Sequence, residues 1–179
     1  IMQAWYPGEK GGDAVADVIF GDYNPSGKLP ITFYRSVEDL PDFLDYTMKN
    51  RTYRYFNGNP LWHFGYGMSY TSFEFGKPKY KQGKLTVDVK NSGKFDGDEV
   101  VQVYIRRIDD VNGPIKTLKA FKRITLKAGE KQNICIDMPR ENFEVWDAET
   151  NTMRVVSGKY EVMVGNSSRA EDLKTITVK

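Results

Sequence analysis

The sequence predicts a mainly β protein in which residues 76–179 form a β-sandwich. Two observations support this fold class. Apolar and polar residues alternate over several short stretches of this part, and an alternation of period two gives a strand one buried face. Val, Ile and Thr are also concentrated here, with 26 of them after residue 75 and ten before it. Their β-branched side chains suit a pleated, half-buried surface.

Five stretches show the alternation most clearly, and we expect a strand in each of them: 85–89, 101–105, 134–138, 160–164 and 176–178. Residues 117–127 mix helical and strand spacings, so we expect a strand with a bulge or bend there. Gly, Asn and Asp residues separate these segments, and about seven or eight strands with such turns are typical of a sandwich. The predicted core takes in four aromatic residues: Tyr104, Phe121, Trp146 and Tyr160.

Residues 1–75 are built differently, since they hold 17 of the 24 aromatic residues. A helix is expected over 12–21, with Asp13 as its N-cap and Gly21 as its left-handed C-terminal residue. The apolar stripe of this helix is formed by Val15, Val18 and Ile19. A short strand is expected over 28–33. These elements are too few to close a core, so we expect this part to pack against something larger.

The composition argues against several kinds of partner and site. The 26 Lys and Arg residues against 24 Asp and Glu give a net charge of +2, a field too weak to attract nucleic acid. No run reaches the length of a membrane span, and no membrane partner is expected. A single cysteine, Cys135, and a single histidine, His63, leave no disulfide and no zinc site, and no metal or cofactor is expected. Because the chain begins at Ile1 without a leader, we interpret it as a fragment.

The reactive residues of the sequence give little indication of catalysis. Cys135 lies between Ile134 and Ile136 on a predicted strand, where a structural thiol is favoured over a catalytic one. The glycines before the first helix fit a packing role better than a phosphate cradle. Four carboxylates cluster in an irregular stretch, and a pair of them could serve a glycosidase, although a solvated loop is favoured: Glu38, Asp39, Asp42 and Asp45.

The passage Tyr53–Phe75 is rich in aromatic residues and leaves two interpretations open. It could stack on the apolar faces of sugar rings, or it could be a buried seam between two units. The composition favours the seam. In an isolated chain such an apolar surface would be exposed. We therefore expect the chain to self-associate through these residues.

Three segments together resemble the C-terminal end of glycoside hydrolase family 3, the β-glucosidase and β-xylosidase family. AWYPGEKGGDAVADVIFGDYNPSGKLPITF (4–33) looks like the last helix and strand of its α/β sandwich domain, and RTYRYFNGNPLWHFGYGMSYTSFEF (51–75) resembles the passage that leaves that domain. VKNSGKFDGDEVVQVYI, LKAFKRITLKAGE and SGKYEVMVGNSS are similar to its fibronectin type III-like domain. The resemblance implies residues 1–33 as the end of the α/β sandwich, 34–75 as a connection and 76–179 as a fibronectin type III-like, immunoglobulin-like β-sandwich.

The resemblance also implies a function. The parent would be a retaining β-glycosidase acting on plant-type oligosaccharides, periplasmic or secreted, whose catalytic carboxylates lie in an upstream (β/α)8 barrel and the α/β sandwich. No residue of this chain matches those catalytic motifs, so the chain alone is expected to be inactive and to stabilise the catalytic domains. Arg51, Tyr53 and Arg54 resemble a segment that approaches the barrel and are expected at the rim of the sugar site. The alternatives are a carbohydrate-binding or adhesion module, and a scaffold that only docks.

Overall fold

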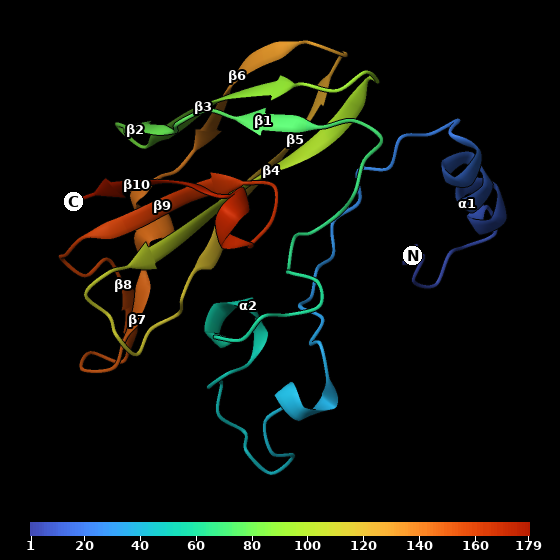
Figure 1. The fold of residues 1–179 in the computed structure, drawn as a ribbon. Coiled ribbons are helices and arrows are strands. Elements are labelled where there is room, and N and C mark those ends of the chain that lie inside the picture. The colour runs from blue at the N-terminus through green and yellow to red at the C-terminus, as the bar shows by residue number, and fades with distance from the viewer.

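The computed structural model describes residues 1–179 and contains two four-stranded antiparallel sheets packed face to face (Figure 1). One sheet consists of β1 (Phe73–Phe75), β2 (Lys79–Lys81), β3 (Lys84–Asn91) and β6 (Lys131–Asp137). The other has the order β10 (Lys174–Val178), β9 (Tyr160–Gly165), β4 (Gly97–Arg107) and β5 (Thr117–Leu126). A separate hairpin joins β7 (Val145–Asp147) to β8 (Thr152–Arg154). The predicted mainly β fold and its sandwich are confirmed.

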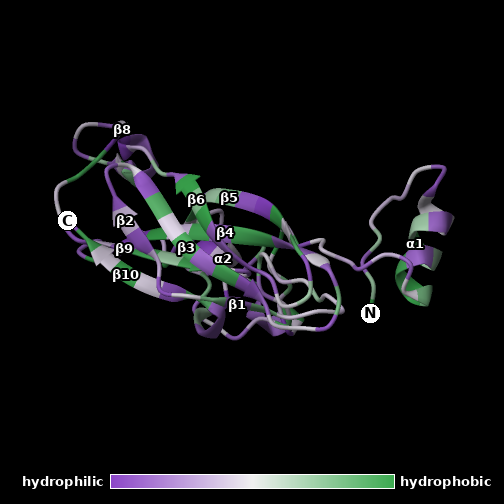
Figure 2. Cartoon of the chain, turned by 90° about the horizontal axis from the view of Figure 1, so that it is seen from above, coloured by the Kyte–Doolittle hydropathy of each residue, from purple (hydrophilic) through white to green (hydrophobic).

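The hydrophobic core lies between the two sheets. Alternate residues of each strand point into it, as the sequence predicts, and the colouring of Figure 2 shows this alternation along the strands. The fully buried residues from β3 and β4 are Leu85, Val87, Val89, Val101 and Val103. β6 and β9 complete the core with Ile134, Ile136, Val162 and Val164. β1 already pairs with β3, so the sheet takes in three residues before residue 76.

The expected irregularity in the strand at 117–127 is a β-bulge. The pairing of β4 with β5 runs from Gly97 opposite Leu126 to Val103 opposite Ala120, and then shifts so that Tyr104 faces Leu118. Lys119 is therefore the extra residue on β5. A bulge of this kind bends the strand and redirects its side chains.

Two residues predicted in the core are largely exposed instead. Phe121 is 68% exposed, because it faces Gln102 on the outer side of the sheet. Trp146 is 57% exposed, because it belongs to the β7–β8 hairpin, where its neighbour Val145 turns toward the core instead. Tyr160 lies in the core as predicted, whereas Tyr104 is buried on the outer face of β4, against Tyr53 and Phe64.

The N-terminal helix α1 (Gly11–Phe20) forms at the predicted place and lies apart from the sheets (Figures 1 and 2). Gly21 ends it with a φ of 88°, as expected of a left-handed C-terminal residue. The prediction that Asp13 caps the helix is wrong. Lys10 occupies the N-cap without a side-chain hydrogen bond, and Asp13 lies in the first turn, 3.4 Å from the Lys10 ammonium.

The strand predicted over 28–33 does not form. The segment runs beside 61–66, but only Phe33 and Trp62 make a β-bridge. Pro30 lies between the two hydrogen-bonded points, Leu29 and Phe33. Its fixed φ and missing N–H explain why no ladder develops.

The remaining helical elements are single turns. They are α2 (Thr52–Tyr55) and the 3-10 turns η1 (Val37–Asp39), η2 (Arg140–Phe143) and η3 (Ala170–Asp172). The first two lie in the connecting segment, below the sandwich in Figure 1.

Candidate functional site

Asn24, in the NPSGKLP motif, connects three segments of the chain. Its Nδ2 atom donates a hydrogen bond of 2.9 Å to the carbonyl of Asp96, directly before β4. Its Oδ1 atom accepts from the backbone N–H of Tyr70 and the hydroxyl of Ser69, both at 2.8 Å. Asn24 therefore fastens the end of the helical segment to the edge of the sandwich.

Lys28, in the same motif, makes a buried ion pair with Glu99 of β4. The Lys28 ammonium lies 2.7 Å from Glu99 Oε1, and the two side chains are 11% and 2% exposed. Asn166 donates to the other carboxylate oxygen at 3.1 Å. Removing one partner of such a buried pair is strongly destabilising, because the charge of the other partner stays buried without a counter-charge.

The FGYGMSYT motif covers the outer face of β4. Gly65 has a φ of 78°, and its carbonyl accepts a 3.0 Å hydrogen bond from the buried amide of Gln102. The same amide also reaches the carbonyl of Asn166 at 2.7 Å. Gln102 in turn accepts from the hydroxyl of Tyr104, whose pKa is raised by burial. A Cβ on Gly65 would collide with Gln102, so the motif requires glycine at this position.

Arg51 and Tyr53, two of the three residues expected at the rim of a sugar site, form hydrogen bonds with backbone groups of this chain. Arg51 donates to the carbonyl of Thr47 at 2.9 Å and to the carbonyl of Asp45, which closes the loop before α2. The Tyr53 ring stacks on Phe64 with a centroid distance of 4.1 Å, and its hydroxyl accepts from the N–H of Leu118 at 3.1 Å. The structure thus places Tyr53 and Phe64 in a seam against the sandwich.

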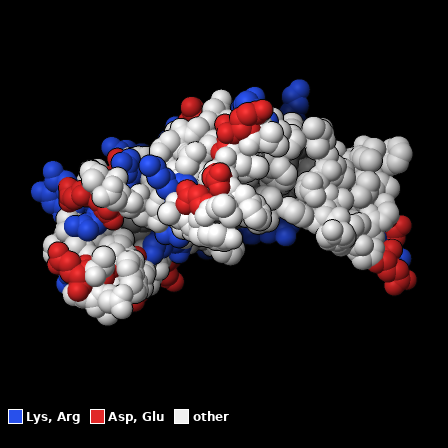
Figure 3. All heavy atoms as spheres, turned by 90° about the horizontal axis from the view of Figure 1, so that it is seen from below, with Lys and Arg blue, Asp and Glu red and all other residues white.

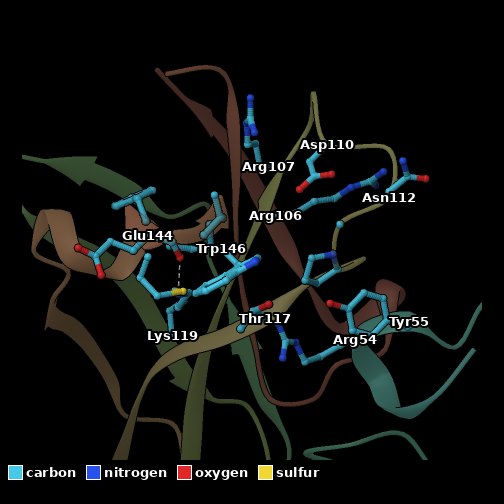
Figure 4. A pocket seen from close by; sticks show the side chains of 16 residues that line it. Arg54, Tyr55, Arg106, Arg107, Asp110, Asn112, Thr117, Lys119, Glu144 and Trp146 are labelled. Atoms are coloured by element: carbon cyan, nitrogen blue, oxygen red, sulfur yellow. Dashed lines mark hydrogen bonds between the residues drawn. The ribbon is translucent and has the colours of Figure 1, made fainter. Parts of the chain in front are cut away.

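Arg54, the third of these residues, lines a cleft between α2, β5 and the β7–β8 hairpin. The cleft has a volume of about 300 Å³. In Figure 4, Arg54 and Tyr55 enter it from α2, on the opposite side of the view from Glu144 and Trp146. The Arg54 Nε atom is buried and has no hydrogen-bond partner. This cleft could not be anticipated from the sequence, because its walls come from three separate segments.

Three of the four carboxylates of the acidic stretch accept hydrogen bonds from the backbone of their own loop. Asp39 accepts from the N–H of Ser36 at 3.3 Å and completes a capping box at η1. Asp42 and Asp45 each accept from the backbone two residues ahead, both at 2.8 Å. The hydrogen bonds from Thr47 lower the pKa of Asp45. These side chains shape the loop that carries them.

The other candidates from the sequence remain separate from one another. His63 is partly buried, and burial together with the nearby Arg169 and Lys116 cations lowers its pKa. Cys135 lies on β6 and faces solvent as a free thiol. No group of three His, Cys, Asp or Glu side chains gathers as a metal site would require. None of the helices has the length and apolar character needed to cross a bilayer.

Comparison with known proteins accounts for these motifs. Residues 1–70 match the model of the glycosyl hydrolase family 3 C-terminal domain, and residues 99–168 match that of the fibronectin type III-like domain. A xylan 1,4-β-xylosidase of Xylanibacter ruminicola is 50% identical over 184 residues, an alignment that covers 99% of this chain and 21% of that protein. The chain belongs to glycoside hydrolase family 3. The NPSGKLP motif lies within the range that matches the family 3 C-terminal domain model, and FGYGMSYT lies at the end of that range.

Other family 3 proteins agree in sequence and in structure. The periplasmic β-glucosidase of Salmonella typhimurium is 38% identical, with 94% of this chain and 25% of that protein covered. A crystal structure of the β-glucosidase from Kluyveromyces marxianus superposes with a TM-score of 0.86 and 35% identity, covering 99% of this chain and 23% of that chain. This chain therefore spans between about a fifth and a quarter of the length of these relatives. It corresponds to their C-terminal region, including the fibronectin type III-like sandwich.

Proposed function

We propose that this chain is the non-catalytic C-terminal structural region of a retaining β-glycosidase, either a β-xylosidase or a β-glucosidase, that acts on plant-type oligosaccharides. One observation carries the proposal. The family motif residues Asn24, Lys28 and Gly65 use their polar groups or backbone to join the N-terminal segment to the sandwich. Their role within this chain is therefore to hold two units together.

The N-terminal segment supports a docking role toward other domains of the same enzyme. Its large apolar side chains are exposed, including Phe20 at 81%, Phe43 at 89% and Tyr46 at 85%. Figure 3 shows that uncharged atoms dominate the end of the molecule where α1 lies, while charged groups are more frequent over the rest. Apolar surface of this kind marks an interface, and the barrel and α/β sandwich domains of family 3 enzymes are the partners that we propose for it.

We divide the chain, as a proposal, into the end of the α/β sandwich domain (1–33), a connecting segment (34–75) and the fibronectin type III-like sandwich (76–179). A periplasmic or secreted location is proposed as well, and the periplasmic Salmonella relative supports it. We also propose Arg51, Tyr53 and Arg54 at the rim of the sugar site, where the hydrogen bonds of Arg51 and Tyr53 would hold the connecting segment in shape. A carbohydrate-binding module is the alternative function, and the exposed Trp146 favours it.

The purified chain should not hydrolyse 4-nitrophenyl β-xyloside or β-glucoside, because its carboxylates serve loop geometry and form no catalytic pair. Release of nitrophenolate is the measurement, with a whole family 3 β-xylosidase as the positive control. Turnover by the pure chain that disappears in the Asp39→Asn or Asp45→Asn variant would disprove the proposal.

The isolated chain should self-associate at high concentration. The sequence predicts self-association through the aromatic passage 53–75, but the structure packs Tyr53 and Phe64 of this passage against Tyr104. The exposed Phe20 and Phe43 are therefore the contact residues that we propose. Sedimentation velocity should show a concentration-dependent increase in size that the Phe20→Ser/Phe43→Ser variant reduces. A monomer at every concentration would show that these side chains form no adhesive surface.

A further inference from the structure

The cleft beside α2 contains an unused hydrogen-bond donor. The Arg54 Nε atom is buried without a partner, while its guanidinium lies 5.4 Å from the ring centroid of Tyr55. In Figure 4 the Arg54 side chain extends from α2 toward Thr117 on β5. A buried donor without an acceptor is unfavourable, and no carboxylate of the chain pairs with the Arg54 guanidinium. This charge is therefore left for a ligand of opposite sign.

The charge of the cleft favours an anion. Four cationic residues line it, against the two acidic residues Asp110 and Glu144: Arg54, Arg106, Arg107 and Lys119. Burial and the nearby Arg54 guanidinium lower the pKa of Lys119. Lys119 donates to the carbonyl of Glu144 at 2.9 Å, as the dashed line in Figure 4 shows, whereas the Glu144 carboxylate points to the edge of that view. No close ion pair neutralises these four cations, although the Glu144 carboxylate acts on Lys119 at longer range and raises its pKa.

The walls of the cleft also offer aromatic surface. Tyr55 and Trp146 lie on opposite sides of it, and Trp146 is 57% exposed although it is a large apolar residue. Aromatic faces pack well against the apolar faces of sugar rings. The volume of about 300 Å³ is at the small end of the range for ligand sites, which suits one or two sugar rings. Asn112 and Asp110 at the rim can bond to sugar hydroxyls.

We propose that this cleft binds a carboxylate-bearing sugar, such as a uronic acid unit on an oligosaccharide. Arg54 and Lys119 hold the carboxylate, and Trp146 and Tyr55 contact the ring. Only the choice of a sugar as the ligand rests on the proposed function. Plant-type oligosaccharides, the proposed substrates, can contain uronic acid units. The cleft would then help to position acidic substrates on the enzyme that carries this region.

The test is a titration of the ¹⁵N-labelled chain with sodium D-glucuronate, followed by the indole N–H signal of Trp146 and the amides of β5. D-glucose is the matched probe, because it differs only in having a hydroxymethyl group in place of the carboxylate. Glucuronate should shift these signals saturably, and glucose should not. The Trp146→Phe variant assigns the indole signal among those of the three tryptophans.

Two variants identify the carboxylate-binding groups. Arg54→Met and, independently, Lys119→Met should each weaken glucuronate binding about tenfold or more, as expected when a charge-assisted hydrogen bond is lost. Lys122→Met is the matched control, because Lys122 lies on the same strand but donates to Cys135 outside the cleft; its affinity should stay within about twofold of the unmodified chain. Lys119→Met keeps the test valid should Arg54→Met fail to fold.

Three results would overturn the proposal. These are the absence of a saturable shift, equal binding of glucose and glucuronate, and binding that persists in both variants. Inorganic phosphate serves as a further arm, and phosphate binding as tight as that of glucuronate would reject the sugar assignment. None of these outcomes affects the proposed function, which is measured by the hydrolysis of neutral aryl glycosides.

Discussion

Replacing Leu85 by Ala should lower the free energy of unfolding by about 2–5 kcal/mol, the usual cost of emptying a large aliphatic site in a core. Leu85 has no exposed surface, and it lies on β3 opposite Ile136 of β6 within the main hydrophobic cluster. The two sheets close around it, so the surrounding residues have little freedom to fill the cavity. Urea unfolding followed by circular dichroism gives the measurement, with an unchanged dependence on urea as the sign of an intact fold.

Trp146→Ala is the informative comparison for Leu85→Ala. The sequence predicts a core position for Trp146 and hence a comparably large loss. In the structure, more than half of the Trp146 surface is exposed on the β7–β8 hairpin. Trp146→Ala should therefore lower the free energy of unfolding by less than about 1 kcal/mol. A loss for Trp146→Ala that equals that of Leu85→Ala would show that the hairpin packs more tightly than the structure indicates.

Lys28→Met should lower the free energy of unfolding by about 3–5 kcal/mol, because it leaves the Glu99 carboxylate buried without its counter-charge. Lys131→Met is the matched control. Lys131 also pairs with a carboxylate, that of Asp88 at 2.8 Å, but the two side chains are 60% and 43% exposed. Exposed pairs contribute about 0–1 kcal/mol, so the control should change stability little.

The double variant Lys28→Met/Glu99→Gln separates the cost of an unpaired charge from the loss of packing. It removes both charges, so it should recover a large part of the stability that Lys28→Met loses. The comparison uses the same urea unfolding measurement. The loss of unfolding free energy in the double variant is compared with the sum of the losses in Lys28→Met and in Glu99→Gln. If the two are equal, the ion pair does not couple the N-terminal segment to the sandwich.

The strands could be predicted from the sequence because their pattern is local. Apolar residues recur with a period of two along β3, β4, β6 and β9, and the bulge at Lys119 corresponds to the mixed spacing in 117–127. The sandwich, its core aliphatics and the end of α1 at Gly21 followed from such patterns. The comparisons with known proteins confirm the resemblance to family 3.

What the sequence could not reveal depends on contacts between distant segments. Trp146 and Phe121 are large aromatic residues within predicted β segments, but one lies on a separate hairpin and the other on the outer face of β4 and β5. Arg54 gave no sign of a cleft, because its partners across the cleft follow it by 50 residues or more. The buried Gln102, which links Gly65 to Asn166, is likewise an ordinary polar residue in the alternation.

The most direct test of the structural role exchanges this region in a whole enzyme. In the xylosidase of Xylanibacter ruminicola, the segment that aligns with this chain at 50% identity is either deleted or replaced by residues 1–179, and β-xyloside hydrolysis and melting temperature are measured. The account predicts that deletion abolishes activity or lowers the melting temperature sharply, while the replacement retains most of both. A deleted enzyme as active and as stable as the intact one would contradict the account.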